Sequence, residues 1–289
     1  MSVMQKIKKG FSIALASLST AVCVLSMSSC TTSKPEVELK ISFNGTNYTL
    51  EYTLFRKIAP ATVSHFLALA DADYYDGLCV HDFSSSKWVT GGYSYANGKL
   101  VEKDYFAAVQ GIELTNTVWY DAAKTEPTYT VYGEFKNNDF EVENGALNQS
   151  FGSLTMYYED KLDGNDDLVD QKVTVLRNDG KGDAKKLYAY NSATSQFYIS
   201  MSTNSSSPSG YCTFALLKEE STATLQSLQQ AVLDYIAEVY GDEATAEEEF
   251  APATEVYIHA NDKYASEREV EYWVPQKPIV IEQVNVKKW

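Results

Sequence analysis

The chain has 289 residues, 44% hydrophobic and 22% charged, a balance that predicts a folded protein of one or two domains and excludes global disorder. Its formal net charge is −15, and it becomes −18 without residues 1–29, which hold three lysines and no acidic residue. An acidic body repels phosphate groups, so we expect no nucleic-acid partner.

The first 29 residues have the pattern of an export signal. Three lysines form a basic start, a small and apolar stretch covers residues 11–27, and small residues precede Cys30. This arrangement resembles a bacterial lipoprotein signal, which implies cleavage before Cys30 and its lipidation, with residues 30–36 as a tether. The resemblance places the protein in the bacterial cell envelope, lipid-anchored and extracytoplasmic. An ordinary secretory signal or a membrane anchor is the alternative, although the serine-interrupted apolar run is short for a transmembrane span.

A hairpin and a helix are predicted after the tether. Residues 37–43 and 48–55 have strand patterns, and Asn44-Gly45 between them is a hairpin signal. Pro60 suits the first turn of a helix, and the apolar residues after it recur at helical spacing as far as Ala70. The sequence therefore begins its folded part with a hairpin followed by a helix.

A turn, a strand and a loop come next. Tyr74-Tyr75-Asp76-Gly77 is a turn signal, an apolar strand runs on to Phe83, and a polar loop leads to Gly91-Gly92. Glycine at the end of a loop permits a positive φ or a close backbone approach. These features alone define only a β-turn-β unit.

The C-terminal part predicts two strands and one long helix. Residues 213–217 and 278–281 have strand patterns. Between them, apolar residues at helical spacing predict a helix over 222–240 whose stripe faces the core. That stripe consists of Leu225, Leu228, Val232, Ile236 and Val239.

The candidates for metal binding and disulfide formation are weak. The acidic stretch 160–167 invites a calcium site, but Lys161 would occupy a ligand position of the EF-hand frame, which favours a solvated turn. The three histidines are scattered, so we expect neither a metal nor a cofactor. Cys79 and Cys212 follow the signal, and either two buried thiols or a disulfide fits them.

The turn-strand-loop unit resembles the cyclophilin family of peptidyl-prolyl isomerases, in which Phe-His-Arg leads to Gln-Gly-Gly. Here the same spacing reads Val80-His81-Asp82 and Thr90-Gly91-Gly92. Family-like motifs recur at Tyr132-Gly133-Glu134, at Leu154-Thr155-Met156 and at Ser195–Ile199. The resemblance implies a mainly β fold, a closed antiparallel barrel with two helices.

The resemblance also implies one domain over 37–289 that carries two insertions. The first insertion covers about 159–190, where 173–176 and 186–190 are expected to pair as a hairpin, and the second covers about 241–269. The acidic start of the second insertion is expected to be exposed.

Position by position, the resemblance places a proline-binding site whose residues differ from the family. Asp82 stands at the position of the arginine that favours the twisted amide, and Tyr211 stands at the histidine position. A carboxylate there would oppose the charge that develops on the amide nitrogen, and an ion pair with Lys87 is expected. The remaining peptide-binding positions are His81, Lys87, Trp88, Thr90, Tyr157, Tyr158, Gln196 and Tyr198.

Three functions compete at this stage. The family implies an isomerase acting on Xaa-Pro bonds of exported proteins, and the substitutions imply that this activity is weak or lost. A catalytically silent module or chaperone that binds proline-containing peptides is the second reading, because an aromatic groove suits proline rings. A structural envelope lipoprotein is the third.

Overall fold

The computed structural model divides the chain into residues 1–30 and 31–289, and the description concerns the second unit. The described residues are 32–138, 147–158, 160–177, 182–189, 192–202, 210–241, 243–259 and 263–289. Cys30 and the signal-like segment lie outside this description. Within the described ranges, no helix has the length and apolarity needed to cross a membrane.

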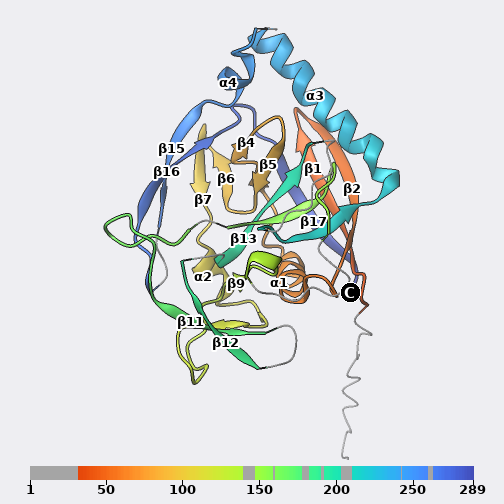
Figure 1. Cartoon of the computed structure of the whole chain (residues 1–289). Helices are drawn as coiled ribbons and strands as arrows, with labels where there is room; N and C mark the ends of the chain where they lie inside the picture. Colours follow the sequence, from red (N-terminus) through yellow and green to blue (C-terminus); the bar gives the residue numbers. More distant parts are fainter. Residues whose placement is uncertain are drawn as a thin grey trace, which may run out of the picture. The chain divides into compact units, whose positions relative to one another are not determined.

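A curled antiparallel sheet of twelve strands forms the body of this unit (Figure 1). In chain order its strands are β1 (Glu36–Phe43), β2 (Thr46–Leu54), β3 (Leu78–Cys79), β4 (Asp82–Phe83), β5 (Lys87–Thr90), β6 (Tyr93–Ala96), β7 (Lys99–Glu102), β9 (Val131–Tyr132), β10 (Leu154–Tyr158), β13 (Ser192–Ser200), β14 (Thr213–Leu217) and β17 (Val280–Lys288). The pairing order is β4-β5-β13-β10-β14-β2-β1-β17-β3-β6-β7, and β9 pairs with β13.

The segment 78–83 joins the two ends of the curl. Its first half, β3, pairs with β17, and the Val80 amide donates to Ile279 O at 2.9 Å. Its second half, β4, pairs with β5, and the His81 amide donates to Val89 O at 2.9 Å. The mainly β, antiparallel fold that was predicted as a closed barrel is therefore confirmed, with a curled sheet as its body.

Two helices pack on the sheet as predicted. Helix α1 (Pro60–Asp71) begins at Pro60 and buries Phe66, whose ring lies 5.1 Å from Phe214 and 5.5 Å from Phe197. Helix α3 (Thr222–Tyr240) buries the predicted stripe except Val239, which is 51% exposed because it lies in the last turn. Shorter helices complete the set, namely α2 (Tyr105–Val109), η1 (Lys136–Asn138), η2 (Glu219–Ser221) and α4 (Ala246–Phe250).

The stretch predicted as the first insertion contributes to a separate small sheet. Strands β11 (Lys172–Leu176) and β12 (Asp183–Leu187) pair as the expected hairpin, and β8 (Val118–Trp119) adds a third strand. Their buried residues form a cluster of their own around Val173 and Tyr188. The insertion thus packs outside the main core but on the 118–132 segment of the chain.

The second insertion forms most of a two-stranded ribbon against the sheet, and the ribbon continues to Trp273, beyond the predicted end of the insertion at about 269. Strands β15 (Ala253–Ile258) and β16 (Arg268–Trp273) pair only with each other among the described strands, and Tyr272 packs with Tyr93. The acidic start of the insertion, 241–249, is mostly exposed among its described residues, as predicted. Phe250 of α4 follows it and is fully buried, 5.1 Å from Phe83. Phe250 therefore anchors the insertion in the main core.

Both cysteines that follow the signal are free. Cys79 and Cys212 are buried, and burial raises the pKa of each thiol to about 12. Of the two alternatives, the structure supports buried thiols and not a disulfide.

Candidate functional site

Strand register sets one row of side chains across the outer face of the curled sheet. Asp82 lies opposite Val89, Val89 opposite Tyr198, and Tyr198 opposite Thr155. Successive residues of a strand point to opposite faces, so their chain neighbours point into the core. The candidate site is therefore built on the outer face of β4, β5, β13 and β10.

A groove of about 620 Å³ opens beside Tyr198, a volume typical of ligand sites. Its aromatic walls are Tyr157, Tyr198 and Tyr211, and the rings of Tyr198 and Tyr211 meet edge to face at 6.4 Å. The structure brings together these three predicted residues and Lys87. Residues that the sequence did not indicate complete the lining, namely Ser86, Gln149, Met156, Asp160, Ser200, Ser202 and Gly210.

Tyr198 is held in place by its hydroxyl. Gln149 Nε2 donates to this oxygen. Burial raises the pKa of Tyr198 to about 12, so the phenol keeps its proton at physiological pH. Tyr198 thus offers a fixed apolar ring, whereas Tyr211 is half exposed at the rim.

Asp82 lies in the same row but does not line this groove. Its Oδ1 accepts the Trp273 amide at 3.3 Å, and its Oδ2 lies 3.8 Å from Lys87 Nζ, the ion pair expected from the sequence. With Trp273 and α4 it lines a second pocket of about 400 Å³. The ribbon of the second insertion therefore covers the position where the family has its arginine.

Lys87 stands between the two pockets. It lines both, and Nζ lies 5.6 Å from the centre of the Tyr157 ring. Its side chain is 42% exposed, so the ion pair with Asp82 is screened by solvent and contributes little to stability.

Trp88 and Thr90 do not line the groove, contrary to the prediction. The register places Trp88 opposite Ile199 and Thr90 opposite Phe197, on the core-facing side. Trp88 is 2% exposed and stacks on Phe83, and Thr90 donates to Cys79 O at 2.8 Å. Tyr158 ends β10, and its side chain lies outside the description.

His81 is a buried support and not a peptide contact, which corrects a further prediction. Its ring lies 4.7 Å from that of Tyr93 and 5.0 Å from that of Tyr272, and Nε2 lies 3.2 Å from Gln196 Oε1. Burial lowers the pKa of His81 to about 3, so the ring is neutral at pH 7. His81 orients Gln196, which reaches a cavity that His81 does not.

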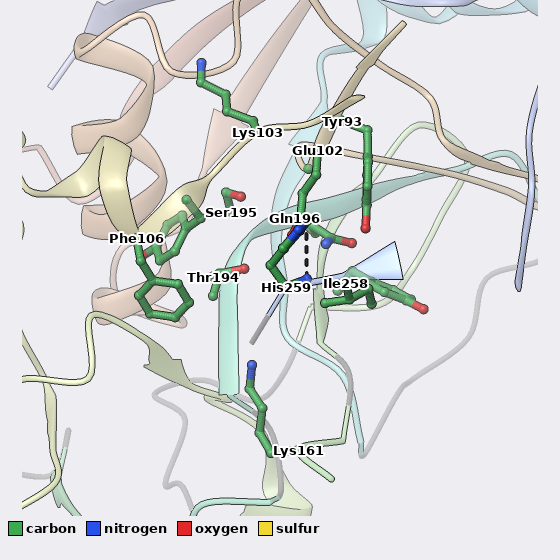
Figure 2. A pocket seen from close by; sticks show the side chains of 13 residues that line it. Tyr93, Glu102, Lys103, Phe106, Lys161, Thr194, Ser195, Gln196, Ile258 and His259 are labelled. Atoms are coloured by element: carbon green, nitrogen blue, oxygen red, sulfur yellow. Dashed lines mark hydrogen bonds and ion pairs between the residues drawn. The ribbon is translucent and has the colours of Figure 1, made fainter. Parts of the chain in front are cut away.

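That cavity, of about 90 Å³, shares Tyr157 with the groove as a lining residue. Figure 2 shows it bordered by Gln196, Glu102 and His259. His259 Nδ1 lies 2.6 Å from Glu102 Oε2, which connects the end of β15 to β7. The nearby Glu102 carboxylate raises the pKa of His259. The second insertion therefore reaches this cavity as well as Asp82.

Gly91 brings the loop end against β13. Its φ is +93°, and a Cβ there would stand 2.5 Å from Ser195 O. The Ser195 hydroxyl donates to Gly91 O at 2.6 Å and lies 3.0 Å from the Tyr74 hydroxyl. The Gly91-Gly92 and Ser195-Gln196 motifs are thus two sides of one close backbone contact.

Two buried histidines predict loss of stability in acid. Burial lowers the pKa of His65 to about 4 and that of His81 to about 3, so the unfolded chain binds more protons as the pH falls below about 6.5. The proton uptake linked to each histidine is expected to lower the free energy of unfolding by about 3 kcal/mol between pH 7 and pH 4. Urea unfolding across this range measures the effect.

Glu134 acts in the opposite direction and supplies the control. Burial raises its pKa to about 7, against the lowering effect of the Ala61 and Thr62 amides that donate to it. Protonated Glu134 therefore stabilises the folded state fully below about pH 4.5, and this stabilisation is lost as the pH rises toward 7. Glu134→Gln should make the acid loss steeper, and an unchanged or flatter profile would contradict the assignment.

Fold and site together define a mainly β protein whose curled sheet carries an aromatic groove on its outer face. The sequence profile of the family described as cyclophilin type peptidyl-prolyl cis-trans isomerase/CLD matches residues 38–249. The chain belongs to this family. No curated protein matches the sequence.

Two solved structures of one protein resemble the chain. The cyclophilin type peptidyl-prolyl cis-trans isomerase of Cryptosporidium parvum is 14% identical with a TM-score of 0.42, over 89% of this chain and 99% of that one. The same protein in the presence of the dipeptide Ala-Pro is 14% identical with a TM-score of 0.41, over 88% and 99% of the two chains.

Proposed function

We propose that this family member binds proline-containing segments of exported proteins in the groove beside Tyr198 and isomerises their Xaa-Pro bonds weakly or not at all. The observation that supports the proposal is that the groove for the proline ring and the arginine position lie in two different pockets. The apolar walls for a proline ring are present at Tyr198 and Tyr211, whereas the arginine position holds an acid that Trp273 engages on the far side of Lys87.

Rotation about an Xaa-Pro bond requires more of the site than binding the proline ring does. Amide resonance sets a barrier of about 18–20 kcal/mol, and a donor aimed at the twisted nitrogen is what lowers it. Tyr157, Tyr198 and Tyr211 offer ring faces and edges, which favour binding of a proline ring but supply no cation. Binding and turnover are therefore separable in this groove.

Binding is tested at Tyr211, which is half exposed and can be changed without emptying the core. We expect Tyr211→Ala to weaken binding of a short neutral Xaa-Pro peptide about tenfold, because aromatic residues dominate such contacts. Fluorescence titration measures the affinity, with the same peptide carrying alanine in place of proline as the ligand control. Tyr257→Ala, an exposed tyrosine on β15, is the matched protein control. Equal binding of both peptides would refute the groove assignment.

We further propose that the protein is anchored through a lipid on Cys30 at the extracytoplasmic side of the cell envelope. The support is the basic, apolar and small-residue order of residues 1–29. Cys30→Ala should release the protein from the membrane fraction, and mass spectrometry of the wild type should find an acylated N-terminal cysteine. Complete membrane partitioning of the variant, together with an unacylated wild-type N-terminus, would exclude this anchor.

A further inference from the structure

The ribbon of β15 and β16 presents an acidic and aromatic outer face. Its inner face packs through Val256, Val270 and Tyr272 toward β6 and β7, and Figure 1 shows the ribbon running along the outside of these strands. The opposite face is exposed. We define it as the acidic ribbon face, which consists of Glu255, Tyr257, Glu269, Glu271 and Trp273.

Like charges lie directly opposite each other on this face. The register pairs Glu255 with Glu271, and Glu269 lies opposite Tyr257 one step along. Like charges at directly opposed positions destabilise a pair of strands. Within the described ranges, no lysine or arginine forms an ion pair with any of the three carboxylates. The isolated ribbon thus carries an electrostatic penalty that a cationic partner would remove.

The acidic ribbon face continues into the pocket of about 400 Å³ beside Asp82. Trp273 ends the ribbon at this pocket with 45% of its surface exposed, and Glu247 and Glu248 of α4 line the other side. Lys87 also lines the pocket, where it pairs with Asp82. Carboxylates beside an exposed indole face are what a lysine or arginine side chain binds, by charge-assisted hydrogen bonds and a cation–π contact.

We propose that the acidic ribbon face and this pocket form a docking surface for an extended, lysine- or arginine-containing segment of a protein partner. Exposed residues recur along each strand at about 6.6 Å, the spacing of alternate side chains in an extended peptide, so basic residues at alternate positions fit the surface. The net charge of −15 disfavours a second copy of the chain, an anionic lipid or a nucleic acid as the occupant. The proposal goes beyond the proline groove and requires no proline in the ligand.

The test uses the full chain and two fluorescent, proline-free ten-residue peptides, one alternating lysine with serine and one alternating glutamate with serine. Anisotropy should show binding of the lysine peptide only, and the affinity should fall as the salt is raised to about 0.5 M. The double variant Glu255→Gln/Glu271→Gln should weaken binding about tenfold. Trp273→Leu, which removes the indole face, should weaken it about threefold.

A matched double variant separates this surface from the general charge of the protein. Glu219 and Glu220 of η2 are exposed and lie outside the ribbon, so Glu219→Gln/Glu220→Gln removes the same charge elsewhere. This control should change the affinity less than about twofold. The ribbon variant should melt at the same temperature as the wild type or higher, because it removes a repulsion. Equal weakening by both double variants, or equal binding of both peptides, would overturn the proposal.

Discussion

Gly91→Ala is expected to destabilise the protein by about 3–5 kcal/mol, because a backbone strain of about 1–3 kcal/mol and a steric conflict of similar size act together. The φ of +93° disfavours any L side chain, and the added Cβ would stand 2.5 Å from Ser195 O. That oxygen belongs to β13 backbone and cannot swing away, so β5 and β13 would have to separate.

Gly98→Ala provides the control for this prediction. Gly98 also has a positive φ, of +78°, but no atom lies within 4 Å of the Cβ position. Gly98→Ala should lower the free energy of unfolding only by the cost of the positive φ, about 1 kcal/mol. Urea denaturation of both variants measures the difference, and equal losses would mean that the Gly91 contact with Ser195 does not hold the strands together.

Asp82→Arg is expected to recover little isomerase activity, less than about tenfold, although one preorganised donor is commonly responsible for about 10²–10³ in rate. The substitution removes the acceptor of the Trp273 amide and places a second cation beside Lys87. Glu247 and Glu248 line the same pocket and would draw the guanidinium toward themselves, away from the groove.

Asp82→Asn separates the effect of charge from that of the missing donor. It keeps an oxygen for the Trp273 amide and removes the negative charge. If the charge alone suppressed turnover, this variant would become active. We expect it to remain near background, as measured by exchange NMR on a short Xaa-Pro peptide. Robust turnover of Asp82→Arg would instead show that only the guanidinium is missing.

Local patterns were sufficient for the first hairpin, for helices α1 and α3 and for the turn at Gly91, but they did not predict β6, β7, β15 and β16. Asn44-Gly45 joins β1 to β2, Pro60 begins α1, and Gly91 has the positive φ and the close backbone approach that a glycine at the end of a loop permits. These features depend on backbone preferences and on spacing within short segments, which a sequence displays directly.

The site was predicted only in part, because position in a motif does not fix the direction of a side chain. Tyr198 and Tyr211 line the groove, but the register turns Trp88 and Thr90 toward the core. The contact of Trp273 with Asp82 joins residues 191 positions apart, and no local pattern reports it. Long-range packing of strand β16 therefore determines which groups contact Asp82 at the arginine position.

Peptide binding without turnover is tested most directly by exchange NMR on a short neutral Xaa-Pro peptide with the wild-type protein. The peptide signals are expected to shift on titration, because Tyr198 and Tyr211 bind the proline ring. Cis–trans exchange is expected to keep its uncatalysed time constant, on the order of tens to hundreds of seconds at 25 °C. Catalysed exchange by the wild type would refute the silent groove and would make Lys87, which borders both pockets, the first candidate donor.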